Sequence, residues 1–218
     1  MCFSPVASFI TAGLTGAVGL TTMSRTTQLR ELPLAATPLF FAVQQGLEGL
    51  LWLNLPAAPQ SPMSKGLVLF FLVFAQVFWP TFAALAALSI EPMKRRRRLM
   101  WPWFAVGLGV SGYLLWGLLT RSHGAQVIED HIVYTTEQPH STAVALAYLA
   151  SVSLPLLLSS RRTLVMLGAV VLVGCAVAYG LYLEAFQSVW CFFAAAASVI
   201  ILAHFEWIRR WRAPPAVA

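Results

Sequence analysis

Long apolar runs separated by short polar segments fill almost the whole chain. Seven runs come close to the roughly 20 apolar residues that a membrane-spanning helix needs. They cover residues 4–23, 33–54, 66–89, 101–120, 141–158, 163–184 and 188–208. The pattern therefore predicts an all-α membrane protein with seven transmembrane helices, forming a single domain over residues 1–218.

Composition supports this class. Hydrophobic residues make up 59% of the 218 residues and charged residues only 10%, against roughly 25% charged in soluble domains. The net charge of +6 comes from short basic clusters between the apolar runs. Such clusters are typical of topology signals, so we expect a lipid bilayer and no nucleic acid as partner.

The distribution of basic residues predicts the orientation, because cytoplasmic loops hold an excess of Lys and Arg. Twelve of the 14 basic residues fall in alternate loops and the C-terminal tail. Only Lys65 and Arg121 fall on the other side. We therefore expect the N-terminus outside, the C-terminus in the cytoplasm, and a multi-pass location in a bacterial inner membrane. No basic residue precedes the first apolar run, so that helix is expected to be retained.

The second apolar run contains the polar residues Gln44, Gln45 and Glu48. At about 100° per residue, these three share one helix face with Trp52. At about 1.5 Å per residue, the two glutamines lie roughly 14 Å below the outer surface and Gln76 of the third run roughly 15 Å below it. The sequence thus predicts a polar layer inside the membrane.

Pro80 adds a backbone group to this layer. Proline lacks an N–H, so in an α-helix it leaves the carbonyl four residues earlier, that of Gln76, without its usual donor. Groups of this kind need partners inside the protein or water in a cavity.

Glu48 is the ionisable member of the layer and has three interpretations. It can knit the second and third helices together through the glutamines. It can handle a ligand, an ion or a proton, which is the default hypothesis for an intramembrane carboxyl. It can also act in catalysis. The sequence leaves these three open.

Further candidates cluster at the outer boundary. Glu184, Gln187, Trp190 and Cys191 join the sixth and seventh runs, and Cys2 begins the first. On an oxidising face Cys2 and Cys191 could form a disulfide. Separate buried thiols, or a metal or redox role, are the alternatives.

The loop of residues 121–140 is the longest and contains His131 and Tyr134. Its β-branched content on either side of residues 129–130 predicts a short hairpin that folds over the outer mouth as a lid. A plain solvated loop is the alternative. The loop contains no HExxH motif and no comparably tight spacing of metal-binding residues, so we predict no metal site there.

Other signals have structural interpretations. GLGVSG, residues 107–112, matches a dinucleotide fingerprint but lies inside an apolar run, so we interpret it as a helix-packing surface. Gly13, Gly16 and Gly19 are interpreted in the same way. Cys175, surrounded by small apolar residues, is interpreted as core packing. Retinal chemistry needs an intramembrane lysine, and both lysines lie in loops.

Four stretches carry a resemblance to a known family. They are MCFSPVASF, QQGLEGLLW, HIVY and EAFQSVWCFFAA, spread over nearly the whole chain. With them the chain resembles a set of uncharacterised bacterial integral membrane proteins that begin Met-Cys-aromatic-Ser. The resemblance implies one compact membrane domain and no assigned activity or cofactor. The chain is unlike the ceramidase type of seven-helix zinc hydrolase, which needs several membrane histidines.

Together these features favour an outward-facing polar cavity that binds, and in one version transports, a small polar or cationic ligand. Its floor would be Gln44, Gln45 and Gln76, its wall Glu48 and Trp52, and its rim Glu184, Gln187, Trp190, Cys2 and Cys191, under a lid with His131 and Tyr134. No internal repeat supports transport. The alternatives are a membrane enzyme using Glu48 or Glu184 with His131 as acid and base, and a non-catalytic subunit of a membrane complex.

Overall fold

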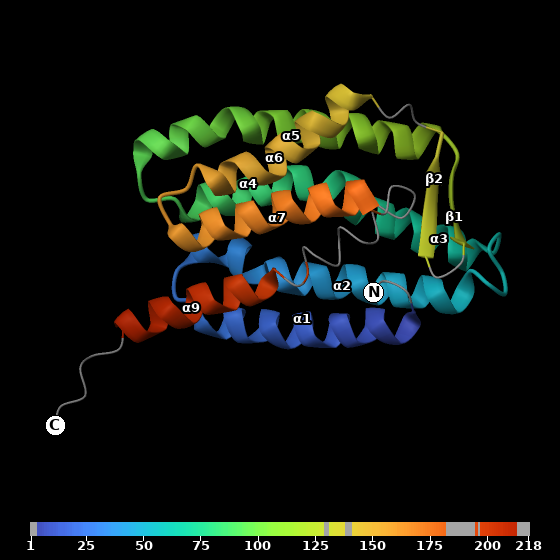
Figure 1. The fold of residues 1–218 in the computed structure, drawn as a ribbon, viewed down its shortest axis with the longest axis horizontal. Helices are drawn as coiled ribbons and strands as arrows, with labels where there is room; N and C mark the ends of the chain where they lie inside the picture. Colours follow the sequence, from blue (N-terminus) through green and yellow to red (C-terminus); the bar gives the residue numbers. More distant parts are fainter. Residues whose placement is uncertain (1–3, 129–130, 138–140, 182–194, 196, 213–218) are drawn as a thin grey trace.

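The computed structural model describes residues 4–128, 131–137, 141–181, 195 and 197–212. Helices form most of it, as expected for an all-α protein (Figure 1). In chain order they are α1 (Pro5–Arg25), the 3₁₀ turn η1 (Leu29–Glu31), α2 (Leu32–Asn54), α3 (Pro62–Leu72), the π-helix η2 (Val73–Phe78), α4 (Trp79–Ile90), α5 (Lys94–Thr120), α6 (Thr142–Leu157), α7 (Arg162–Leu181) and α9 (Ser198–Arg212). Strands β1 (His123–Ile128) and β2 (His131–Thr136) lie between α5 and α6.

Local sequence explains where two of these helices begin. The Ser4 hydroxyl accepts a hydrogen bond from the Ala7 N–H at 3.2 Å, and the Ser61 hydroxyl accepts one from the Ser64 N–H at 3.1 Å. Each serine is followed by a proline, whose fixed φ and missing N–H suit the first helical position. Ser-Pro thus starts both α1 and α3.

Among the described residues, three helices are long and apolar enough to cross a membrane: Pro5–Arg25, the continuous segment Pro62–Ile90 and Lys94–Thr120. The apolar parts of α6, α7 and α9 are shorter, at Thr142–Leu157, Arg162–Ala178 and Ser198–Trp207. This helical structure is therefore compatible with a membrane protein. Helix α5 starts at Lys94, within the basic cluster and seven residues before the predicted apolar run 101–120.

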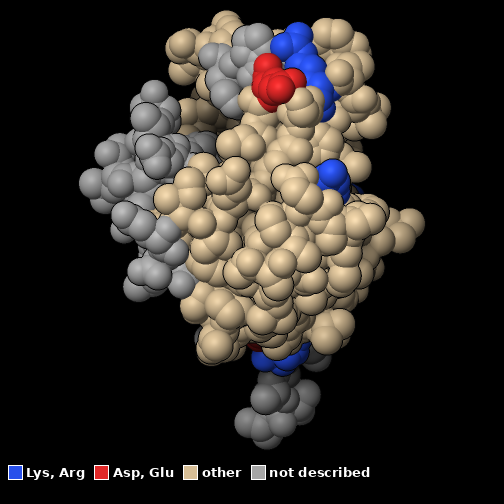
Figure 2. Space-filling model, turned by 90° about the vertical axis from the view of Figure 1, so that its right-hand side faces the viewer, with Lys and Arg blue, Asp and Glu red and all other residues tan. Residues whose placement is uncertain are grey.

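Successive helices run in alternate directions (Figure 1). The ends of α1, α4 and α6 and the starts of α2, α5 and α7 lie at the left-hand end of that view. This end therefore holds the basic residues at the α1–α2, α4–α5 and α6–α7 connections. The opposite end holds the α2–α3 connection and the hairpin. Figure 2, seen from that opposite end, shows mainly uncharged residues.

Small residues let α1 and α2 pack closely. A Cβ on Gly19 would lie 2.8 Å from the Leu39 backbone nitrogen, and one on Gly49 would lie 2.8 Å from the Phe9 ring. Gly16 faces Ala42 at an ordinary 3.6 Å, whereas Gly13 has open space. The packing interpretation is therefore confirmed for Gly16 and Gly19, and these two glycines are not left free for another subunit.

The third apolar run bends where η2 meets Pro80. In a π-helix the hydrogen bond spans five residues, so the carbonyl opposite Pro80 is that of Ala75 and not, as an α-helical register predicts, that of Gln76. The Tyr148 hydroxyl donates to the Ala75 carbonyl at 2.6 Å. A side chain of α6 thus replaces the donor that proline lacks.

The close approach of α5 to α4 occurs at the same bend. A Cβ on Gly107 would collide with the Pro80 carbonyl, so only glycine fits there. The Ser111 hydroxyl, one turn further along α5, donates to the Val77 carbonyl at 2.5 Å. Gly109 and Gly112 have open space around them. Of the three glycines in GLGVSG, only Gly107 therefore forms the expected packing contact.

The expected hairpin is present. Strands β1 and β2 pair antiparallel, with Ala125 opposite Tyr134. The Tyr134 ring stacks on Phe71 of α3, with centroids 4.4 Å apart and planes 3° from parallel. Ala125 and Ile132 are buried in a cluster with Trp52, so the hairpin packs over the ends of α2 and α3.

Candidate functional site

The polar face of α2 points into the bundle, as predicted. Gln44 and Glu48 have no exposed surface, Gln45 is 1% exposed and Trp52 is 9% exposed. Amides and carboxyls are rarely buried to this extent unless they are hydrogen-bonded. The contacts of these side chains therefore decide what the layer can do.

The Gln44 side chain forms a hydrogen bond that joins two helices. Its Oε1 accepts a hydrogen bond from Trp79 Nε1 at 2.7 Å. The Trp79 ring in turn stacks on Phe41, one turn earlier on α2, with centroids 4.1 Å apart. This contact ties α2 to the first turn of α4, immediately before Pro80.

Glu48 accepts a hydrogen bond from Gln45 Nε2 at 3.2 Å, one turn away on the same helix. Two buried polar atoms beside this pair have no hydrogen-bond partner in the described part of the chain, namely Gln45 Oε1 and Trp52 Nε1. The buried Ser8 hydroxyl of α1 also has no hydrogen-bond partner among the described residues. The next residue, Phe9, packs against Gly49 of α2. Among the described residues, an acceptor on Gln45, a donor one turn beyond Glu48 on Trp52 and the Ser8 hydroxyl of α1 therefore remain unsatisfied.

Three of the other predicted site residues lie in described elements, and five lie outside the described residues. Gln76 lies in η2 and is 7% exposed. His131 and Tyr134 lie in β2, and Tyr134 packs against the buried cluster that contains Trp52. Five predicted residues lie outside the described residues: Cys2, Glu184, Gln187, Trp190 and Cys191. The rim and the predicted disulfide therefore stay predictions.

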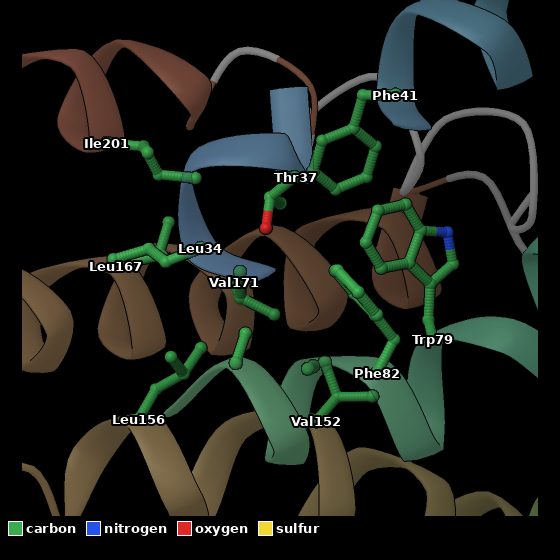
Figure 3. Close-up of a pocket in the computed structure, with 12 residues that line it drawn as sticks. Leu34, Thr37, Phe41, Trp79, Phe82, Val152, Leu156, Leu167, Val171 and Ile201 are labelled. Atoms are coloured by element: carbon green, nitrogen blue, oxygen red, sulfur yellow. The ribbon is translucent and has the colours of Figure 1, made fainter. Parts of the chain in front are cut away.

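One cavity of about 50 Å³ lies elsewhere than the predicted polar one (Figure 3). Its lining is apolar apart from the Thr37 hydroxyl, which donates to the Pro33 carbonyl at 3.1 Å. The side chains drawn in Figure 3 come from α2, α4, α6, α7 and α9; the labelled ones are Leu34, Thr37, Phe41, Trp79, Phe82, Val152, Leu156, Leu167, Val171 and Ile201.

None of the predicted site residues that the structure describes lines this cavity. The Gln44 amide accepts a hydrogen bond from Trp79 Nε1, and this nitrogen points away from the other lining side chains in Figure 3. The Trp79 ring therefore separates the apolar space from the polar face of α2.

Glu91, at the end of α4, forms a site that sequence reasoning missed. Its Oε1 accepts from the Met93 N–H at 3.0 Å and the Ser160 hydroxyl at 2.7 Å. Its Oε2 accepts from the Ser160 N–H at 2.8 Å and the Ser159 hydroxyl at 2.9 Å. Burial raises the pKa of Glu91, but these hydrogen bonds, from Ser160 above all, outweigh burial and hold it below its ordinary value.

Arg96 and Arg161 reinforce the connection between the same two loops. Arg96 donates to the carbonyls of Leu158 at 3.0 Å and Ser159 at 2.9 Å, at the end of α6. Arg161 Nε donates to the Ile90 carbonyl at 3.4 Å. The α4–α5 and α6–α7 connections are thus bound to each other, and Glu91 is the acceptor at their centre. A glutamate between an apolar run and a basic cluster was the available signal.

His204 also has a defined partner. Its Nδ1 lies 2.5 Å from the Thr163 hydroxyl of α7, and the side chain is 2% exposed. Cys175 packs against the main apolar core, as expected for a packing residue. In the described ranges, no group of three or more His, Cys, Asp or Glu side chains is placed to hold a metal ion.

Comparison with known families adds one assignment. The model of a family described as "Family of unknown function (DUF6629)" matches residues 1–218. The chain belongs to this family. The match covers the whole chain and agrees with the resemblance to an uncharacterised family. No curated protein and no solved structure matched the chain.

Proposed function

We propose that this chain is a seven-span inner-membrane protein that binds a small polar or cationic ligand beside Glu48. The N-terminus would lie outside and the C-terminus in the cytoplasm. The observation that carries the binding site is a fully buried carboxyl flanked by polar atoms that the described residues leave unsatisfied. Burying such groups without partners costs roughly 1–3 kcal/mol each.

The chemistry of these groups favours a ligand that donates hydrogen bonds. The Glu48 carboxylate and Gln45 Oε1 are acceptors, and the Trp52 ring, one turn beyond Glu48, offers a face that attracts cations. A protonated amine can donate to both acceptors and lie against that face, while the Trp52 N–H needs an acceptor of its own. The proton itself is the smallest ligand of this class, with Glu48 as its acceptor.

The proposed orientation rests on the alternating helices and the uneven charge of the two ends. We expect a cysteine introduced at Lys65 to react with a membrane-impermeant maleimide in intact cells, in a background that lacks the native cysteines. A cysteine at Arg162 should react only after the membrane is permeabilised. The reverse pattern would show that the orientation is inverted.

Ligand binding can be tested by thermal stabilisation of the purified full chain. Ammonium and methylammonium serve as probes, because a ligand at 100 times its dissociation constant adds about 2.7 kcal/mol. The stabilisation should vanish in Glu48→Gln, which keeps the size of the side chain. It should persist in Glu137→Gln, an exposed carboxyl at the end of the hairpin. An equal response from both variants would argue against the site.

The enzyme alternative requires His131 within hydrogen-bond reach of Glu48 or Glu184, or linked to one of them by a single water. Glu184 lies outside the described residues, and no specific observation favours this alternative over binding.

A further inference from the structure

A dense group of cations lies around the start of α5. Lys94, Arg95, Arg97 and Arg98 are all exposed in its first turns. Arg161 and Arg162 lie on the neighbouring connection, which the Glu91 and Arg96 hydrogen bonds hold against α5. We call these six residues the inner basic patch.

Its charges are not neutralised within the described protein. The ion pairs found among the described residues both use Glu206, with Arg25 and Arg209. Glu91 lies beside the patch, but its oxygens accept from Met93, Ser159 and Ser160. The four cations of α5 therefore have no carboxylate partner there.

Their arrangement is also unfavourable for the helix alone. Lys94 is three and four residues from Arg97 and Arg98, and Arg95 is three from Arg98, so like charges share a face. Each such pair destabilises an isolated helix by roughly 0.2–0.5 kcal/mol. Cations at a helix N-terminus also oppose the helix dipole. A bound anion would relieve both effects.

The length of α5 places the patch at the depth of lipid headgroups. The helix has 27 residues and is therefore about 40 Å long, against about 30 Å for the hydrocarbon core. About seven residues must extend beyond the core. The exposed Trp101 follows the basic run, and tryptophans favour the interface.

We propose that the inner basic patch binds the headgroup phosphates of anionic phospholipids in the cytoplasmic leaflet. The inference rests on the proposed membrane insertion and orientation, but not on a ligand at Glu48. A phospholipid is the occupant because the cations lie where the apolar part of α5 leaves the bilayer. Arginine suits this role, since its planar guanidinium matches phosphate oxygens.

The test uses the full chain purified in detergent, with bound lipid counted by native mass spectrometry. Phosphatidylglycerol should bind in preference to phosphatidylcholine. The triple variant Arg95→Gln, Arg97→Gln, Arg98→Gln should bind phosphatidylglycerol on the order of 100-fold more weakly.

The matched control removes the same charge at the same end of the molecule, through Arg25→Gln, Arg30→Gln, Arg209→Gln. Glu206 pairs with two of these arginines and cancels one of their charges, so this variant should lose less than about tenfold. Equal losses in the two triple variants would show that only net charge matters and would overturn the proposal.

Two further outcomes would also overturn it. One is equal binding of the two lipids, which would leave the patch as a topology signal. The other is tight binding of inorganic phosphate without lipid, which would indicate a soluble anion. If the site variant does not fold, the salt dependence of the wild type decides, because the preference for phosphatidylglycerol should shrink between about 0.05 and 0.5 M NaCl.

Failure of this proposal is distinguishable from failure of the proposed function. Loss of the lipid preference would leave the cysteine-labelling pattern and the Glu48-dependent stabilisation unchanged. An inverted labelling pattern would instead place the patch on the outer face and remove the basis for a cytoplasmic-leaflet site.

Discussion

Removing the Glu91 carboxyl should weaken the link between the α4–α5 and α6–α7 connections. In Glu91→Ala four donors lose their acceptor: the Met93 N–H, the Ser160 N–H, the Ser160 hydroxyl and the Ser159 hydroxyl. Met93 and Ser160 are exposed, so water can replace most of what they lose. Ser159 is only 2% exposed, so its hydroxyl proton is left without an acceptor in the interior, although its oxygen still accepts from the Arg161 N–H.

The magnitude follows from these exposures. An unsatisfied buried hydroxyl costs about 1–3 kcal/mol, and three exchanges of a charged acceptor for water cost a few tenths to about 1 kcal/mol each. We therefore expect a loss of about 3 kcal/mol in the free energy of unfolding. For a chain of this size that corresponds to a thermal midpoint about 6–12 °C lower.

The assay is thermal unfolding of the purified chain in one detergent, followed by circular dichroism. Glu91→Gln should lose less than Glu91→Ala, because its amide oxygen still accepts two hydrogen bonds. Glu137→Ala, which removes an exposed carboxyl, should change the midpoint by less than about 2 °C. If Glu91→Ala behaves like Glu137→Ala, the four hydrogen bonds do not stabilise the fold.

The same carboxyl predicts a pH dependence. The folded-state pKa of Glu91 lies below its ordinary value of 4.5. A carboxyl with a depressed pKa contributes stability above its unfolded pKa and loses that contribution as the pH falls through the folded one. The midpoint difference between wild type and Glu91→Ala should therefore be constant above pH 5.5 and shrink below about pH 4.5. A difference that is unchanged at pH 3 would refute this reasoning.

The remaining predictions concern the bend of the third apolar run. Gly107→Ala should destabilise the chain by about 1–3 kcal/mol, because the new methyl group collides with the Pro80 carbonyl. Gly109→Ala, in open space on the same helix, should instead be neutral or stabilising by up to about 1 kcal/mol in the same thermal assay. Tyr148→Phe should cost about 1–2 kcal/mol and speed amide hydrogen exchange around η2, because the Ala75 carbonyl loses its donor. Unchanged exchange there would argue against a role for this hydroxyl at the bend.

The sequence was sufficient for features that depend on local periodicity. Apolar run length located the helical segments to within a few residues over most of the described chain, and the 3.6-residue repeat placed Gln44, Gln45 and Glu48 on one buried face. The hairpin followed from β-branched residues on both sides of a turn. These properties are set by neighbours within one or two turns of the chain.

The partners of those residues depended on the tertiary structure. Periodicity predicts that Gln44 is buried, but not that an indole 35 positions later donates to it and separates it from an apolar cavity. The sequence identifies Pro80 as a break in the helix. Only the structure shows that the π-helix leaves the Ala75 carbonyl without a backbone donor, and that the Tyr148 hydroxyl of α6 donates to it instead.

Glu91 shows most directly which contacts the sequence does not predict. By sequence it is one charged residue between an apolar run and a basic cluster, yet its main donors lie 68 and 69 positions away. The buried face of a helix is a property of a whole segment, and the local order of apolar and polar residues encodes it. A hydrogen bond between distant segments requires two side chains to meet within about 3 Å, and only the packing of all the helices determines which ones do.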